Sequence, residues 1–160
     1  MSAVLQDLAP IIRPMREHDL MRIHTIEQAA YQFPWSIGVF GECLRAGYSC
    51  WIIAHEEVTV GYAIMSVAVQ ESHILNLCID PSYHRNGFAQ ELLKHMLKTA
   101  EDYDAVISYL EVRPSNQGAI RLYENAGYSQ VGVRSDYYPA LDGREDAYIM
   151  SRQLSGKSFA

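Results

Sequence analysis

The stretch from Ser72 to Ala100 constrains the fold most, because an almost continuous apolar run is followed by a short loop and then a periodic apolar run. The first run, SHILNLCID (72–80), lacks the alternation of a half-exposed strand, so it predicts a strand covered on both faces. From Phe88 to about Ala100, apolar residues recur at helical spacing, which predicts a helix with one buried face. A strand, a loop and a helix in this order indicate an α/β domain.

The rest of the chain supplies further strands and helices around this unit. The patterns predict strands at 11–15, 48–56, 58–70, 105–112, 128–134 and 146–154, and helices at 18–31, 36–45 and 115–127. Asp19 and Ser36 can cap two of these helices, and Gly47 and Gly127 can end two. We expect a long loop at 135–145 and a disordered tail at 155–160. The order implies one domain over 1–160, with an ordered core at about 11–152 and a mixed, mostly antiparallel, twisted sheet flanked by helices.

Charge and cysteine content narrow the classes of function. The formal net charge is −6 and no run of Lys or Arg occurs, which argues against sequence-independent binding to nucleic acid and weakly suits a cationic partner. The three cysteines have no CxxC spacing and the six histidines form no HxxxH pair, so we predict neither a disulfide framework nor a metal site. We see no signal peptide or membrane span, and expect a cytoplasmic protein without a membrane partner.

The loop DPSYHRNGFAQ (80–90) can hold an anion where it enters the predicted helix. The first N–H groups of a helix lack intrahelical partners, and the helix dipole favours a negative charge there. Gly87 and the small Ala89 leave room for close approach, and Arg85 adds a cation. The loop contains neither GxGxxG nor a Walker pattern. Taken alone, it is therefore more often an ordinary turn between a strand and a helix.

Four segments carry a resemblance to a known family. HRNGFA (84–89) resembles the acetyl-CoA loop [RQ]-x-x-G-x-[GA] of the GCN5-related N-acetyltransferase (GNAT) superfamily, with His84 in place of Arg or Gln. FPWS (33–36), YLEVRPSNQGAIRLYENAGY (109–128) and YYPALDGREDAYIM (137–150) resemble the bacterial ribosomal-protein-alanine N-acetyltransferases (RimI type), a likeness that covers about residues 11–152. The resemblance implies the GNAT fold, with acetyl transfer from acetyl-CoA to the N-terminal alanine amine of small-subunit ribosomal protein eighteen.

The resemblance also implies where the acetyl donor binds. The pyrophosphate would rest on the loop, and the pantetheine arm would enter where the strand ending at Ile79 splays from its neighbour. The implied cofactor-binding residues are Leu77, Cys78, Ile79, Arg85, Asn86, Gly87, Phe88, Ala89, Gln90 and Asn116. Asn116 also stands where an asparagine caps a helix, and the two roles are compatible. No metal is implied.

Glu111 and Tyr123 are the candidate catalytic residues. Strand alternation puts Glu111 on one face with Ile107, where apolar surroundings would raise the pKa of its carboxyl towards neutrality. The resemblance implies that Glu111 is the base, and an ion pair with Arg113 is the structural alternative. The resemblance implies that Tyr123 protonates the departing CoA thiolate, and a place in the core is the alternative.

Other functions stay open at this point. A protein or peptide acceptor is favoured by the segment 137–146, although a hairpin tip explains these residues equally well. The alternatives are a lysine or small-amine N-acetyltransferase of the same fold, a non-catalytic acyl-CoA-binding module, and a nucleotide-binding module. Because no cysteine stands beside a suitable histidine in these motifs, we expect direct transfer in a ternary complex and no acyl-enzyme.

Overall fold

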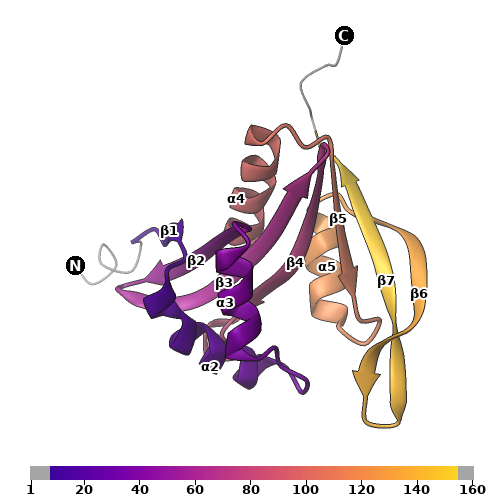
Figure 1. Ribbon diagram of the computed structural model, residues 1–160, viewed down its shortest axis with the longest axis horizontal. Helices are drawn as coiled ribbons and strands as arrows, with labels where there is room; N and C mark the ends of the chain where they lie inside the picture. The colour runs from indigo at the N-terminus through magenta and orange to yellow at the C-terminus, as the bar shows by residue number, and fades with distance from the viewer. Residues whose placement is uncertain (1–7, 155–160) are drawn as a thin grey trace. The chain divides into compact units, whose positions relative to one another are not determined.

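The computed structural model describes residues 8–154, so the expected tail at 155–160 lies outside the described residues. The elements follow the chain in the order expected from the sequence (Figure 1). The strands are β1 (Ile11–Pro14), β2 (Ser49–His55), β3 (Val58–Ala68), β4 (Glu71–Ile79), β5 (Ile107–Val112), β6 (Ser129–Ala140) and β7 (Gly143–Gln153). The helices are η1 (Glu17–Asp19), α2 (Leu20–Ala30), α3 (Ile37–Arg45), η2 (Pro81–Tyr83), α4 (Phe88–Asp102) and α5 (Gln117–Asn125).

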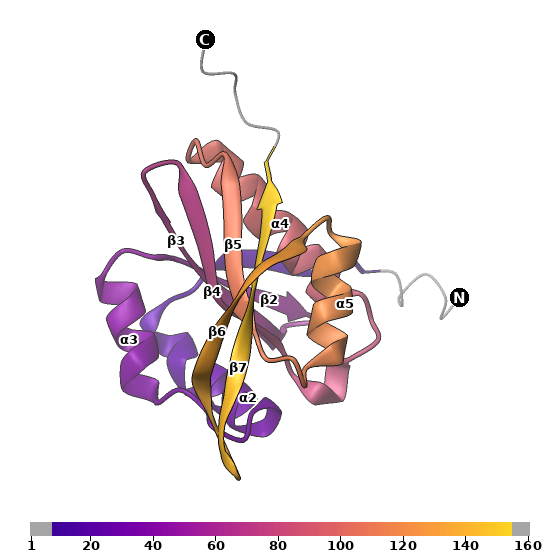
Figure 2. The same ribbon diagram turned by 90° about the vertical axis from the view of Figure 1, so that its right-hand side faces the viewer.

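Within the described residues, the strands form a seven-stranded sheet in the order β1-β2-β3-β4-β5-β7-β6. β4 and β5 are parallel, whereas β1 with β2, β5 with β7 and β6 with β7 are antiparallel. Figure 2 shows the long β6–β7 ribbon coiling about itself, as the right-handed twist of strands requires. The prediction of an α/β fold with a mixed, mostly antiparallel, twisted sheet is confirmed.

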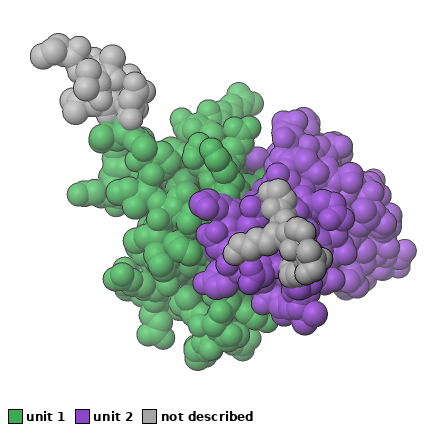
Figure 3. Space-filling view, turned by 90° about the horizontal axis from the view of Figure 1, so that it is seen from above, with its two compact units in different colours: residues 1–64, 76–95 green, residues 65–75, 96–160 purple. Residues whose placement is uncertain are grey.

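The chain divides into two compact units that alternate along the sequence, coloured separately in Figure 3. Unit 1 comprises residues 1–64 and 76–95, and unit 2 comprises residues 65–75 and 96–160. β3, β4 and α4 each supply residues to both units. The organisation as one domain stays a prediction.

Unit 1 is built around two amphipathic helices and the strands that they accompany. The Ser36 hydroxyl accepts a hydrogen bond from the Val39 N–H at 3.3 Å, which confirms the predicted start of α3. α2 and α3 lie side by side (Figure 1), and Phe40 of α3 meets Tyr62 of β3 edge to face at 5.4 Å between ring centroids. The fully buried side chains of this unit include Ile23, Ile26, Phe40, Ile52, Ile53, Val60, Tyr62, Ile64 and Leu92.

The prediction that Asp19 caps the helix that follows it is wrong. Asp19 precedes α2, but its carboxylate makes no capping bond to that helix. It instead accepts two hydrogen bonds from Arg13, at 2.7 and 2.8 Å, and one from the Arg16 N–H at 2.8 Å. Because η1 already leads the chain into α2, the buried carboxylate serves an ion pair with β1 instead.

Unit 2 contains the long hairpin of β6 and β7, and here the predicted loop at 135–145 is wrong. The strands continue through this segment and turn at Leu141 and Asp142 before Gly143, whose φ is +119°. Register shifts between Gln130 and Gly132, and between Arg134 and Tyr138, accommodate the irregular stretch. Pro139 lies opposite Arg144 and is tolerated because β6 is the last strand of the sheet, a position where proline is accepted.

Two features are absent from the described residues. No helix among them is long and apolar enough to cross a membrane. They also contain no group of three or more His, Cys, Asp or Glu side chains placed to hold a metal ion.

Candidate functional site

The start of α4 presents an open set of backbone donors. The first intrahelical bond runs from the Glu91 N–H to the Gly87 carbonyl at 3.1 Å, so the N–H groups of Phe88, Ala89 and Gln90 have no partner inside the helix. Gly87 has φ +77°, and a Cβ added there would meet nothing within 4 Å. The backbone is therefore bare at the point where the helix dipole favours an anion, and it fits a pyrophosphate.

Side chains of the loop hold its shape. The Asn86 amide donates to the Tyr83 carbonyl at 2.9 Å and to the His84 carbonyl at 3.3 Å. The His84 Nε2 lies 3.0 Å from the Ile79 carbonyl oxygen. Phe88 is buried and its ring lies 5.2 Å from that of His55, so it can offer a ligand only its backbone. The cofactor contacts expected at residues 85–90 stay predictions.

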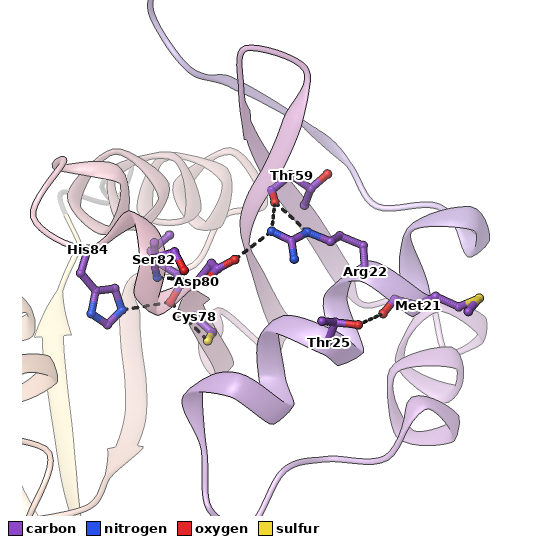
Figure 4. Close-up of polar contacts among 9 residues, drawn as sticks. Met21, Arg22, Thr25, Thr59, Cys78, Asp80, Ser82 and His84 are labelled. Atoms are coloured by element: carbon purple, nitrogen blue, oxygen red, sulfur yellow. Dashed lines mark hydrogen bonds and ion pairs between the residues drawn. The ribbon is translucent and has the colours of Figure 1, made fainter.

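An ion pair fastens the beginning of the same loop (Figure 4). The Asp80 carboxylate accepts a hydrogen bond from Arg22 at 2.8 Å and one from the Ser82 N–H at 3.0 Å. The Arg22 guanidinium also donates to the Thr59 carbonyl at 3.1 and 2.9 Å. Burial alone raises the pKa of Asp80, but the Ser82 N–H and the Arg22 charge together hold it below its ordinary value. Asp80 therefore stays charged and ties α2 and β3 to the loop.

The end of β4 is packed tightly against β3. A Cβ at Gly61 would lie 2.6 Å from the Cys78 carbonyl oxygen and 2.4 Å from Ile79 Cδ1, so only glycine fits there. The Tyr31 hydroxyl donates to the Leu77 carbonyl at 3.4 Å. Burial raises the pKa of the Cys78 thiol to about 12, so this thiol is a poor nucleophile. The pantetheine contacts expected at Leu77, Cys78 and Ile79 concern their backbone and stay predictions.

A buried carboxylate joins three segments of unit 1. Glu27 is 2% exposed and accepts hydrogen bonds from the Tyr62 hydroxyl, the Asn76 amide at 3.0 Å and the Trp35 N–H at 2.9 Å. The Trp35 ring lies 5.3 Å from Phe40. The FPWS segment is thus a packed connection between α2 and α3, held beside β4 by Glu27.

Glu111 lies in a charged cluster on unit 2. Its Oε2 is 2.5 Å from the Nε2 of His73 on β4, and its Oε1 is 3.4 Å from the Nε of Arg134 on β6. β5 alternates as predicted, with half-buried Ile107, Tyr109 and Glu111 between buried residues. Arg113 pairs with Glu145 at 3.2 Å, so the ion pair considered for Glu111 and Arg113 is replaced by the contacts with His73 and Arg134.

The expected rise in the pKa of Glu111 is wrong. The hydrogen bond from His73 holds the pKa of Glu111 below its ordinary value, burial opposes this effect, and the charge of Arg134 adds to it. Burial alone would favour the neutral carboxyl, but the contacts with His73 and Arg134 outweigh the effect of burial. Glu111 is therefore a carboxylate at neutral pH.

The β6–β7 hairpin contributes aromatic rings and charges near this cluster. The Arg113 guanidinium lies 4.4 Å above the Tyr138 ring and donates to the Pro139 carbonyl at 2.8 Å. Burial, and then the negative charge of Glu111, raise the pKa of Tyr138 to about 12, so its hydroxyl keeps its proton. Glu145 accepts hydrogen bonds from the N–H and the hydroxyl of Ser115 at 2.9 and 3.1 Å, which fixes the hairpin to the segment before α5.

α5 carries the other predicted residues of unit 2. Asn116 caps it, because its side-chain oxygen accepts from the Ala119 N–H at 3.2 Å. Tyr123 is 7% exposed and its ring lies 5.7 Å from that of Tyr128. The cofactor contact of Asn116 and the proton transfer by Tyr123 stay predictions.

The predicted site residues thus fall into two groups. Residues 77–79 and 85–90 lie in unit 1, whereas Glu111, Asn116 and Tyr123 lie in unit 2. Sequence reasoning does not single out Glu27, His73 or Arg134. The only local signals for a role of Glu27 and His73 are that each is a polar residue inside an otherwise apolar segment. What they contact is decided by residues of other elements, which a local pattern does not show.

Comparisons with known proteins identify the family of this chain. The Acetyltransferase (GNAT) family profile matches residues 15–128. The [Ribosomal protein bS18]-alanine N-acetyltransferase of Escherichia coli K12 is 36% identical over 144 residues, which cover 90% of this chain and 97% of that protein. The enzyme of the same name from Haemophilus ducreyi is 34% identical over 90% of this chain and 100% of its own length.

A solved structure extends the likeness to three dimensions. The crystal structure of the ribosomal-protein-S18-alanine N-acetyltransferase from Escherichia coli superposes with a TM-score of 0.87 at 34% identity, over 94% of this chain and 97% of that chain. The fold and the family predicted from the motifs are therefore confirmed. This chain belongs to the GNAT acetyltransferase family, whose members use acetyl-CoA, in its group of bacterial ribosomal-protein-alanine N-acetyltransferases.

Proposed function

We propose that this chain acetylates the N-terminal alanine amine of the small-subunit ribosomal protein bS18, in the cytoplasm where ribosomal proteins are made. The observation that supports it most is the 36% identity with the Escherichia coli bS18-alanine enzyme over 90% of this chain. The structure adds a bare helix start at Gly87 and a Glu111 carboxylate held by His73. The net charge of −6 also suits a cationic acceptor.

The chemistry follows from the needs of acyl transfer to an amine. When bound, acetyl-CoA supplies an activated thioester. The N–H groups of residues 88–90 hold its pyrophosphate, and Asn116 and the backbone of residues 77–79 hold its arm. Glu111 serves as the base for the amine, and Tyr123 donates a proton to the departing thiolate. An α-amine titrates near ~8 and a lysine amine near ~10.4, so the base has less to do for an N-terminus.

The test uses a peptide that begins with alanine and carries one internal lysine. After incubation with acetyl-CoA, fragmentation mass spectrometry is expected to find the acetyl group on the α-amine. The same peptide with a blocked N-terminus is the control and is expected to stay unmodified. Acetyl on the lysine alone would instead make the chain a lysine acetyltransferase. No transfer, with acetyl-CoA binding shown separately, would indicate a non-catalytic binding module.

The pyrophosphate cradle gives a separate prediction. Gly87→Val is expected to weaken acetyl-CoA binding about tenfold or more, because a β-branched side chain resists φ +77° and would stand on the bare face. The backbone strain is on the order of 1–3 kcal/mol. Isothermal titration with acetyl-CoA measures the change in Kd.

Gly47→Val is the matched control for Gly87→Val. Gly47 ends α3 with φ +76°, and a Cβ there also meets nothing within 4 Å. The same strain is therefore introduced away from the loop, and Kd is expected to keep its wild-type value. Equal Kd values for both variants and the wild type would contradict the cradle at Gly87.

A further inference from the structure

We propose that His73 and Glu111 act as one proton-accepting pair, in which the imidazole takes the proton released by the acceptor amine and the carboxylate holds the imidazole in place. This assignment rests on the proposed function and revises one part of it, because Glu111 then acts as the base through the imidazole of His73 and does not take the amine proton directly. It gives a role to a residue of β4 that none of the shared motifs contains.

Both oxygens of the Glu111 carboxylate are engaged. One oxygen lies 2.5 Å from His73 Nε2, and the other lies 3.4 Å from Arg134 Nε. A carboxylate engaged on both oxygens by donors is stabilised in its charged form and is a weak proton acceptor. Glu111 alone is therefore poorly suited to receive the amine proton.

The contact with Glu111 also decides which ring nitrogen of His73 can accept a proton. Because Glu111 is a carboxylate, the ring nitrogen that faces it carries the proton, so the neutral ring of His73 is protonated on Nε2. Nδ1 then holds the lone pair, and within residues 8–154 no hydrogen bond engages it. The lone pair is available for a proton, and the resulting imidazolium would be stabilised by the adjacent carboxylate.

The two side chains of the pair differ in accessibility. The His73 side chain is 35% exposed, whereas that of Glu111 is 11% exposed. β4 and β5 are parallel with His73 opposite Tyr109, so the pair bridges neighbouring strands and Glu111 lies one step further along the same face. The imidazole is the member of the pair that a substrate or a water can reach more easily.

Several charged and titratable groups lie near His73 and Glu111. They include Tyr109 on β5, which lies opposite His73, and Arg134 and Tyr138 on β6. Arg134 opposes a second positive charge on His73, whereas Glu111 favours it. Tyr138 keeps its proton at neutral pH and adds no charge.

The reaction balances with these groups. The acceptor reaches the site as an ammonium and loses one proton to His73 Nδ1. The amine nitrogen forms a bond to the acetyl carbonyl carbon while the bond from that carbon to sulfur breaks. The nitrogen loses its second proton as the amide forms, Tyr123 gives its proton to the thiolate, and the second proton of the nitrogen restores the Tyr123 hydroxyl. The net products are the acetylated peptide, CoA thiol and one proton, which leaves His73 for solvent.

The experiment compares His73→Gln with the wild type, using the alanine peptide and saturating acetyl-CoA over a range of pH. Glutamine can still hydrogen-bond to Glu111 but cannot take a proton. At neutral pH, kcat/KM is expected to fall about 10²-fold or more. The ratio of wild type to variant is expected to shrink above pH ~8, where the α-amine arrives neutral.

Two further variants define the result. His18→Gln is the matched control, because His18 also lies beside a carboxylate, 3.5 Å from Asp19, and it is expected to keep wild-type kcat/KM at every pH. The double variant His73→Gln/Glu111→Gln is expected to be no slower than the slower single variant, because the two residues act as one unit. Defects that multiply would contradict the pair.

A wild-type rate in His73→Gln, or a defect of constant size at all pH values, would overturn the proposal. If this variant does not fold, nitrogen NMR of the wild-type imidazole decides the question, since the reverse tautomer with its proton on Nδ1 would also overturn it. Failure of the proposed function is distinguishable, because the wild type itself would then leave the alanine peptide unmodified.

Discussion

Glu111→Gln is expected to lower kcat by about 10²–10⁴ while Kd for acetyl-CoA stays unchanged. The substitution preserves the shape of the side chain but removes the charge that His73 and Arg134 contact at 2.5 and 3.4 Å. Without that charge the amine proton has no stable destination. Turnover is expected to suffer most at low pH, where more of the acceptor is an ammonium. Steady-state kinetics and calorimetric titration measure the two quantities separately.

Glu124→Gln is the control for this substitution, because Glu124 is an exposed residue of α5. It is expected to leave kcat unchanged. Wild-type turnover in Glu111→Gln would remove Glu111 as the base, and a loss of acetyl-CoA binding would show that the variant disturbs more than proton transfer.

The lowered pKa of Glu111 also predicts how stability depends on pH. The folded chain holds the carboxyl below its ordinary value of 4.5, so its contacts stabilise the fold fully above that value. The stabilisation is lost as the pH falls through the lowered pKa. The difference in melting temperature between the wild type and Glu111→Gln is therefore expected to shrink in acid.

Tyr123→Phe is expected to lower kcat by about 10²–10⁴ with little change in melting temperature. Phenylalanine retains the buried ring that packs 5.7 Å from Tyr128 but has no proton for the thiolate. Single-turnover kinetics measure the chemical step directly.

Tyr128→Phe is the matched control for Tyr123→Phe. Tyr128 is 3% exposed and its hydroxyl shares a hydrogen bond of 2.6 Å with Ser108. Loss of this hydrogen bond is expected to lower the free energy of unfolding by about 1 kcal/mol, with kcat unchanged. The opposite outcome, full activity in Tyr123→Phe, would assign Tyr123 to the core alone.

Local sequence signals predict the elements of this chain where local chemistry decides them. Ser36 and Asn116 cap the helices that they precede, because a capping bond spans only three residues. The segment 135–145 is mispredicted, because proline and Asp-Gly are typical of turns, whereas pairing with β7 keeps it extended. Asp19 is mispredicted for a similar reason, since Arg13 on another element outcompetes the helix N-terminus for its carboxylate.

The same distinction between local signals and contacts with distant residues applies to the candidate site. The face on which Glu111 lies follows from the alternation of one strand. Its pKa does not, because His73 is 38 residues away and is brought to Glu111 only by the parallel register of β4 and β5. The bare helix start at Gly87 is visible in the sequence, whereas the contacts of Asp80 with Arg22 and Thr59 require the packing of unit 1.

The irregular backbone of β6 bears on how the protein behaves at high concentration. An outermost strand with regular, unsatisfied N–H and C=O groups invites another chain to pair with it and begin aggregation. β6 is interrupted by two register shifts, carries Pro139, and has Asp136 at φ +51°. A second copy would find no long, even row of donors and acceptors. The hairpin can thus display its tyrosines and charges without becoming a template for intermolecular sheets.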